Sequence, residues 1–94
     1  MIEVQLSTQT LQKQIVAFHD NTVVFYFATG NQPYIFHVGH IKTIEIREKG
    51  GKYYLTVSTG LKDNTEEVSP QALNKARELV AAVQAAKEAF SSLQ

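Results

Sequence analysis

The chain has 94 residues, with nine basic and nine acidic side chains and no cysteine. This length supports one domain with a single hydrophobic core. The balanced, scattered charge argues against nucleic acid as a partner, since phosphate is bound by clustered lysine and arginine, and the lack of cysteine excludes disulfides, thiol nucleophiles and cysteine zinc sites.

The N-terminus has neither the basic region nor the apolar run of a signal peptide. No later run approaches the ~18 apolar residues of a transmembrane helix. We therefore expect a cytoplasmic protein without a transmembrane segment, for which peripheral membrane contact stays open. Met1 and the short tail after Phe90 favour a complete product.

Alternation of apolar and polar residues predicts a short strand at the start of the chain. Ile2, Val4 and Leu6 carry the apolar positions, and the polar residues 7–10 then turn the chain. The loop length decides which face these three side chains take. A four-residue loop places them opposite the core, and a loop of three or five places them on the core face.

A hairpin follows, with Asp20-Asn21 at its tip. Both residue types tolerate the backbone of a tight turn, so the runs 11–18 and 23–28 are expected to pair through a two-residue loop. The predicted pairs are Phe18 with Val23, Ala17 with Val24, Val16 with Phe25, Ile15 with Tyr26 and Gln14 with Phe27. Both faces of this hairpin are largely apolar.

The breakers at 29–33 end the second strand of this hairpin, and another strand is predicted over 34–38. The pairs expected for a four-residue loop are Phe27 with Tyr34, Tyr26 with Ile35, Phe25 with Phe36, Val24 with His37 and Val23 with Val38. The aromatic residues Phe25, Phe27 and Phe36 then share one face, which we interpret as the core face.

A glycine pair fixes the next hairpin. Gly50-Gly51 lies between two alternating runs, and glycine tolerates the positive φ angles of a type I′ turn. The predicted pairs are Glu48 with Tyr53, Arg47 with Tyr54, Ile46 with Leu55, Glu45 with Thr56, Ile44 with Val57 and Thr43 with Ser58. The apolar residues of both strands meet on one face in this register. A short last strand is expected over 65–68.

Ser69-Pro70 predicts the start of a helix that reaches about residue 91. Serine can accept a hydrogen bond from an early backbone N–H, and proline fits the first helical position. An apolar stripe at three- and four-residue spacing contains Ala72, Ala76, Leu79, Val80, Val83, Ala86 and Phe90. The helix is therefore amphipathic and can cover the strands.

Seven short strands followed by one C-terminal amphipathic helix resemble the pleckstrin-homology (PH) superfold. The segments that carry the resemblance to small bacterial proteins of this superfold are FHDNTVVFYF, YIFHVGHIKTIEIREKGGKYYLTVS and ALNKARELVAAVQAA. The resemblance implies a mainly β, PH-like domain over residues 1–94, with seven antiparallel strands in two sheets that form a partly open barrel capped by the helix. It implies no single function, because the superfold hosts many.

The best-known activity of this family is phosphoinositide binding through a K-x-n-R-x-R pattern in the first two strands. This sequence departs from that pattern, since residues 7–10 are uncharged and Lys13 is the only basic residue of either strand. Binding of a lipid headgroup or small ligand at the open end of the barrel, near Lys42, Asp20 and Asn21, is therefore kept as the alternative function.

The residues give no catalytic or metal signature. His37 and His40 have an H-x-x-H spacing but straddle Gly39 at a corner, and His19 is offset along the sheet. No serine or threonine lies in a nucleophile motif, and no carboxylate pair is placed in a cleft. We expect a protein that is not an enzyme and uses no cofactor or metal.

The pattern that points to a function is a second apolar face on the first strands. Its residues are Ile15, Ala17, Val24, Tyr26, Ile35 and His37. Monomers rarely expose large contiguous apolar areas, so this face is either covered by the first strand or bound by a partner or a second copy. The sequence thus predicts a non-catalytic interaction module with Tyr26 as its anchor. A peptide strand added to a sheet edge beside the helix is a second route.

Overall fold

The computed structural model describes residues 2–6, 14–27 and 33–92. The predicted turn at 7–10, the strand residues predicted at 11–13 and 28, and the breakers at 29–32 lie outside the described residues. The elements are the strands β1 (Ile2–Leu6), β2 (Gln14–His19), β3 (Thr22–Phe27), β4 (Tyr34–His37), β5 (Thr43–Lys49), β6 (Lys52–Ser58) and β7 (Asp63–Val68), then a 3₁₀ turn (Pro70–Ala72) and the helix α1 (Leu73–Ser92).

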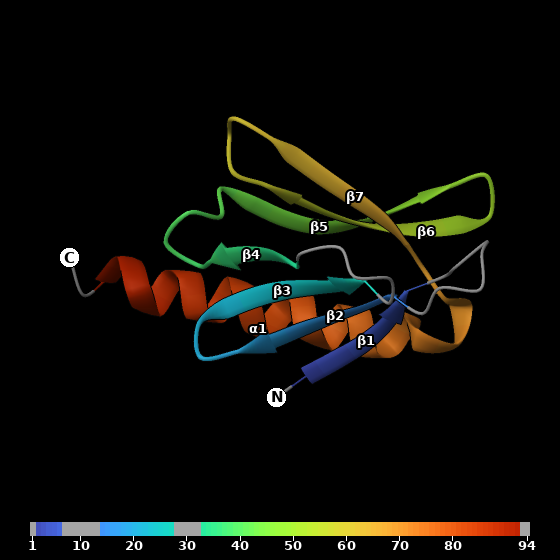
Figure 1. The fold of residues 1–94 in the computed structure, drawn as a ribbon, viewed down its shortest axis with the longest axis horizontal. Helices are drawn as coiled ribbons and strands as arrows, with labels where there is room; N and C mark the ends of the chain where they lie inside the picture. Colours follow the sequence, from blue (N-terminus) through green and yellow to red (C-terminus); the bar gives the residue numbers. More distant parts are fainter. Residues whose placement is uncertain (1, 7–13, 28–32, 93–94) are drawn as a thin grey trace.

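All seven strands belong to one antiparallel sheet in the order β4-β3-β2-β1-β7-β6-β5 (Figure 1). The prediction of two sheets was wrong, because Leu6 of β1 pairs with Val68 at the end of β7 and joins the two halves. The sheet does not close into a barrel, and β4 and β5 are its two edges. Alternation in the sequence assigns faces to each strand but cannot show which distant strands pair.

The two tight hairpins, β2–β3 and β5–β6, have every pair that was predicted for them. Their turns have positive φ at both central residues, with 51° and 59° at Asp20 and Asn21 and 60° and 79° at Gly50 and Gly51. This is the backbone of a type I′ turn, whose twist matches that of the strands. Turn residues and strand alternation together fix these registers.

The pairing of β3 with β4 differs from the prediction by two residues. Phe25 lies opposite Tyr34 rather than opposite Phe36. A shift of two residues leaves every side chain on its predicted face. Phe25 still meets Phe36 edge to face, with ring centroids 5.9 Å apart. The prediction failed because the register was based on an assumed loop length, and the sequence has no turn signature there to fix it.

The first strand, β1, faces the core. Val4 lies opposite Val16, and both side chains are fully buried. This decides the register that the sequence left open. The β1 residues on the other face are Glu3 and Gln5, both exposed, so β1 does not cover the second apolar face of β2 and β3.

The core lies between the sheet and α1, which contacts β1, β2 and β5. Ala76, Leu79 and Val83 of α1 are buried at the spacing of one helix face. The sheet and its β4–β5 corner contribute Val4, Leu6, Val16, Val23, Phe25, Val38, Ile41, Ile44, Leu55, Val57 and Val68. Within the described residues, no helix combines the length and apolar character needed to cross a membrane.

The helix begins differently from the prediction. Pro70–Ala72 form a 3₁₀ turn, and α1 starts only at Leu73. The Ser69 hydroxyl donates to Gln71 Oε1 at 2.6 Å and makes no capping bond to a backbone N–H. The proline position was predicted correctly because its fixed φ suits either kind of first turn.

Candidate functional site

The predicted interaction residues belong to the face of β1–β4 that points away from the core, which we call the outer face. Its members are Glu3 and Gln5 of β1, Ile15, Ala17 and His19 of β2, Thr22, Val24 and Tyr26 of β3, and Ile35 and His37 of β4. The strands bring these residues together because side chains two apart share a face.

The centre of the outer face is apolar and partly open. Tyr26 is 50% exposed and Ile35 is 64% exposed, while Ile15 and Val24 are half-buried. Tyr26 lies beside Ile15, and Val24 lies beside Ile35. We call these four residues the apolar patch. Ala17 was predicted as a fifth contact residue, but it is only 4% exposed and forms the floor of the patch.

His37 is engaged elsewhere. Its ring packs edge to face against Phe90 of α1, with ring centroids 5.1 Å apart. Its Nδ1 accepts a hydrogen bond from the Gly39 N–H at 3.0 Å. A Cβ on Gly39 would lie 2.8 Å from Phe90 Cε1, so the turn after β4 sits tightly on the helix. His37 therefore fixes the corner between β4 and α1.

The residues of the alternative ligand site take part in internal contacts. The Asn21 carbonyl, at the β2–β3 tip, accepts the Val38 N–H at 2.9 Å. The Lys42 carbonyl accepts a hydrogen bond from Lys87 Nζ at 2.5 Å. Asp20 lies at the same tip as Asn21, beside His19, with Oδ2 and Nε2 3.1 Å apart. These contacts tie both segments to the fold.

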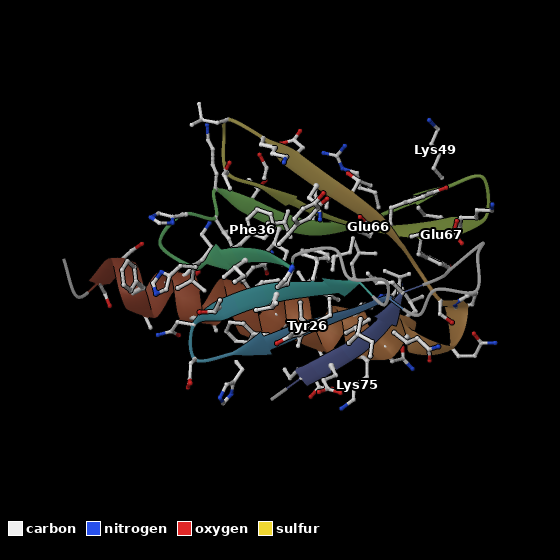
Figure 2. All side chains as sticks on the ribbon, viewed as in Figure 1. Tyr26, Phe36, Lys49, Glu66, Glu67 and Lys75 are labelled. Atoms are coloured by element: carbon white, nitrogen blue, oxygen red, sulfur yellow. The ribbon has the colours of Figure 1, made fainter. Side chains whose placement is uncertain are left out.

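Open hollows on other surfaces include two that are lined by described residues. One, of about 590 Å³, is lined by Gln84, Lys87, Glu88, Ser91 and Ser92 of α1. The other, of about 720 Å³, is lined by Arg47, Glu48, Lys49, Gly50, Lys52, Tyr54, Thr56 and Thr65. Figure 2 shows Lys49 at the tip of the β5–β6 hairpin, well apart from Tyr26.

Charges in the second hollow are largely paired. Arg47 Nη2 lies 2.5 Å from Glu45 Oε1, and Lys52 Nζ lies 3.7 Å from Glu67 Oε1. The paired carboxylates reduce the attraction that these cations exert on an anion. Among the described residues, no group of three or more metal-binding side chains is placed to hold a metal ion.

The edge strand β5 directs part of its backbone toward solvent. Its two-residue turn makes Lys49 and Lys52 a hydrogen-bonded pair, so bonded residues alternate along the strand from there. The backbone groups of Ile44, Ile46 and Glu48 therefore point away from β6, toward the edge of the sheet.

Side chains of α1 occupy the start of this edge. Gln84 Nε2 donates to the Ile44 carbonyl at 3.2 Å, and Lys87 Nζ donates to the Lys42 carbonyl. These two bonds take acceptors that a peptide strand beside the helix would need. The sequence did not identify Gln84 or Lys87, because nothing in it says which strand the helix lies against.

Two polar groups lie on the core-facing side of β7. Glu66 is opposite the buried Leu55, and burial raises the pKa of its carboxyl above the ordinary value of 4.5. Asn64 lies two residues earlier, and its buried Nδ2 has no hydrogen-bond partner among the described residues. Burial of such groups opposes folding unless they are partnered.

Comparison with known proteins yields no match to a family model, a curated protein or a solved structure. The functional interpretation therefore rests on the geometry and chemistry of the residues themselves.

Proposed function

We propose that this chain is a non-catalytic interaction module of PH-like fold that associates with a second copy of itself through the apolar patch. The observation that carries the proposal is the exposure of Tyr26 and Ile35, 50% and 64%, in one contiguous area. The apolar side chains of β1 point into the core, and α1 packs against that core, so neither covers this area. Seven antiparallel strands followed by a helix support the PH-like assignment.

A second copy suits the patch as an occupant. The chain has no net charge, so two copies do not repel each other at long range. The described residues of the patch are uncharged, and Glu3 and His19 lie at its margin. An apolar centre with a polar rim is typical of protein interfaces. A two-fold pair uses the same area on both copies and needs no second partner.

The size of the patch predicts weak association. Strands are spaced about 4.8 Å apart and rise about 3.3 Å per residue, so three strands of five residues cover roughly 240 Å². A standard stable interface buries about 800 Å² on each partner. We therefore expect a dimer that dissociates on dilution, unless further contacts add to the patch.

Molar mass in solution, measured by light scattering over a concentration range, tests this proposal. Ile35→Arg should give a folded monomer, because it places a charge on the most exposed residue of the patch. Leu61→Arg is the matched control, since Leu61 is fully exposed in the turn between β6 and β7. Wild type and Leu61→Arg should both dimerise with rising concentration. A wild type that stays monomeric, or a Leu61→Arg that behaves like Ile35→Arg, would overturn the proposal.

A further inference from the structure

The edge strand β4 has a hydrogen-bonding pattern that can be derived from one contact. The Val38 N–H donates to the Asn21 carbonyl at 2.9 Å. Two residues back, Phe36 lies opposite Val23. Bonded and non-bonded pairs alternate in an antiparallel ladder, so Phe36 also directs its backbone groups to β3. The residues between, Ile35 and His37, direct theirs away from β3, toward the edge of the sheet.

The donors and acceptors on this edge are not symmetric. Ile35 offers both its N–H and its carbonyl. His37 offers only its N–H, because its carbonyl accepts the His40 N–H at 2.8 Å. Pro33, two residues before Ile35, has no N–H and offers only a carbonyl. The edge therefore presents an acceptor at its start, a donor and an acceptor in its centre, and a donor at its end.

From this pattern we infer that two copies pair antiparallel through β4, with Ile35 opposite Ile35 of the second copy, so that their sheets become continuous. This inference rests on the proposed self-association and locates its contact at Ile35, the member of the apolar patch on the sheet edge, with Tyr26 outside the seam. Each Ile35 N–H donates to the Ile35 carbonyl of the other copy. Each His37 N–H donates to the Pro33 carbonyl of the other copy. Every backbone donor and acceptor that Pro33, Ile35 and His37 offer to the edge is then used.

The neighbouring registers do not satisfy the same groups. With Ile35 opposite His37, a carbonyl that His40 already occupies would be required as an acceptor. With Ile35 opposite Pro33, the missing proline N–H would be required as a donor. A shift by one residue would place each edge-directed residue opposite a residue whose backbone groups point to β3. The edge therefore specifies one pairing.

The side chains of β4 suit this pairing. Its sequence, YIFH, contains no aspartate, glutamate, lysine or arginine, which are the residues that commonly protect an edge. The inferred register places Ile35 against Ile35 on the outer face and Tyr34 against Phe36 on the core-facing side. Aromatic and β-branched pairs directly across strands stabilise a sheet. The pairing also covers Ile35, which is 64% exposed in the single chain.

The absence of cysteine makes disulfide trapping a direct test, since each single-cysteine variant reports one position. Ile35→Cys should form a disulfide-linked dimer, because directly opposed residues have Cα atoms about 5.5 Å apart, within the range of a disulfide. Tyr26→Cys is the control on the neighbouring strand. Its two copies are separated by three strand spacings and are offset by four residues along the strands, which places them roughly 20 Å apart, too far to react.

Dimer formed by Ile35→Cys at a rate at least about tenfold above that of Tyr26→Cys supports edge pairing. Faster reaction of Tyr26→Cys, with a wild type that dimerises in light scattering, overturns edge pairing but leaves the proposed self-association standing. A wild type that stays monomeric overturns both. Leu61→Cys reports random collision, and an Ile35→Cys rate no higher than that of Leu61→Cys also overturns edge pairing.

Ile35→Pro tests the backbone bonds without a new thiol. It removes an N–H that points away from β3, so the ladder to β3 keeps its bonds. Two bonds of the dimer are lost, and we expect the dissociation constant to rise roughly tenfold or more. Circular dichroism checks the fold. A folded Ile35→Pro that dimerises as tightly as wild type would overturn the inferred pairing. If the proline variant does not fold, Ile35→Lys keeps the N–H but places two like charges directly opposite each other, and an unchanged dissociation constant would again overturn the pairing.

Discussion

The two edges of the sheet, β4 and β5, are built in opposite ways. The sequence of β5, TIEIREK, carries charges of both signs, and Gln84 and Lys87 of α1 bond two carbonyls at its edge. The sequence of β4, YIFH, carries none of these charges and lies beside the apolar patch. Natural sheets usually protect their edges against association. The difference is the one expected if β4, and not β5, pairs with a second copy.

The largest expected effect comes from loosening α1, which closes the β5 edge. Leu79 is fully buried between α1 and the sheet. Leu79→Ala should lower the free energy of unfolding by about 2–5 kcal/mol, because it removes buried methyl groups and leaves a cavity. Urea unfolding measures this loss. Ala85→Ser, at an exposed position of the same helix, should change it by less than about 0.5 kcal/mol. Equal effects of the two variants would contradict the described packing of α1.

A smaller effect is expected from removing one bond that closes the β5 edge. Gln84→Ala leaves the Ile44 carbonyl without its donor at 3.2 Å. The cost should be roughly 0.5–1.5 kcal/mol in urea unfolding. The variant also makes the start of β5 more like β4, so light scattering should show a larger mass than wild type at high concentration. Glu88→Ala, an exposed change on α1, is the control, and an identical mass profile for both variants would count against a protective role of Gln84.

The smallest effect is expected from the ionisation of one carboxyl in β7, in the half of the sheet that ends at β5. Burial raises the pKa of Glu66 above its ordinary 4.5 in the folded state. The folded state therefore holds this proton more tightly than the unfolded state, and stability should fall as pH rises from about 4.5 through the raised pKa. Glu66→Gln removes this part of the pH dependence. Urea midpoints measured between pH 4 and pH 8 should diverge in favour of the variant, and parallel curves would contradict the assignment.

Much of the fold could be predicted from local signals. Asp20-Asn21 and Gly50-Gly51 each determine a turn, and the alternation beside them then leaves one register. Between β3 and β4 no turn signature was present, and the predicted register was off by two residues. The single sheet was missed because it depends on β1 meeting β7, two strands that are far apart in the chain.

The candidate site was predictable only as a set of residues on one face. A period of two residues placed Tyr26 and Ile35 together, and the structure leaves both exposed. The burial of Ala17 and the packing of His37 on Phe90 depend on neighbours that no pattern names. The same holds for the bonds from α1 to β5. The contrast between the two edges depends on where α1 lies, because its side chains bond the β5 edge.

Hydrogen exchange at the Ile35 amide, measured as a function of protein concentration, is the most direct test of pairing through β4. The Ile35 and Ile46 amides both point to an edge of the sheet, so Ile46 on β5 is an internal control in the same molecule. We predict that protection of Ile35 rises with concentration while that of Ile46 stays constant. An Ile35 amide whose exchange does not depend on concentration, or an Ile46 amide that changes in parallel with it, would contradict pairing through β4.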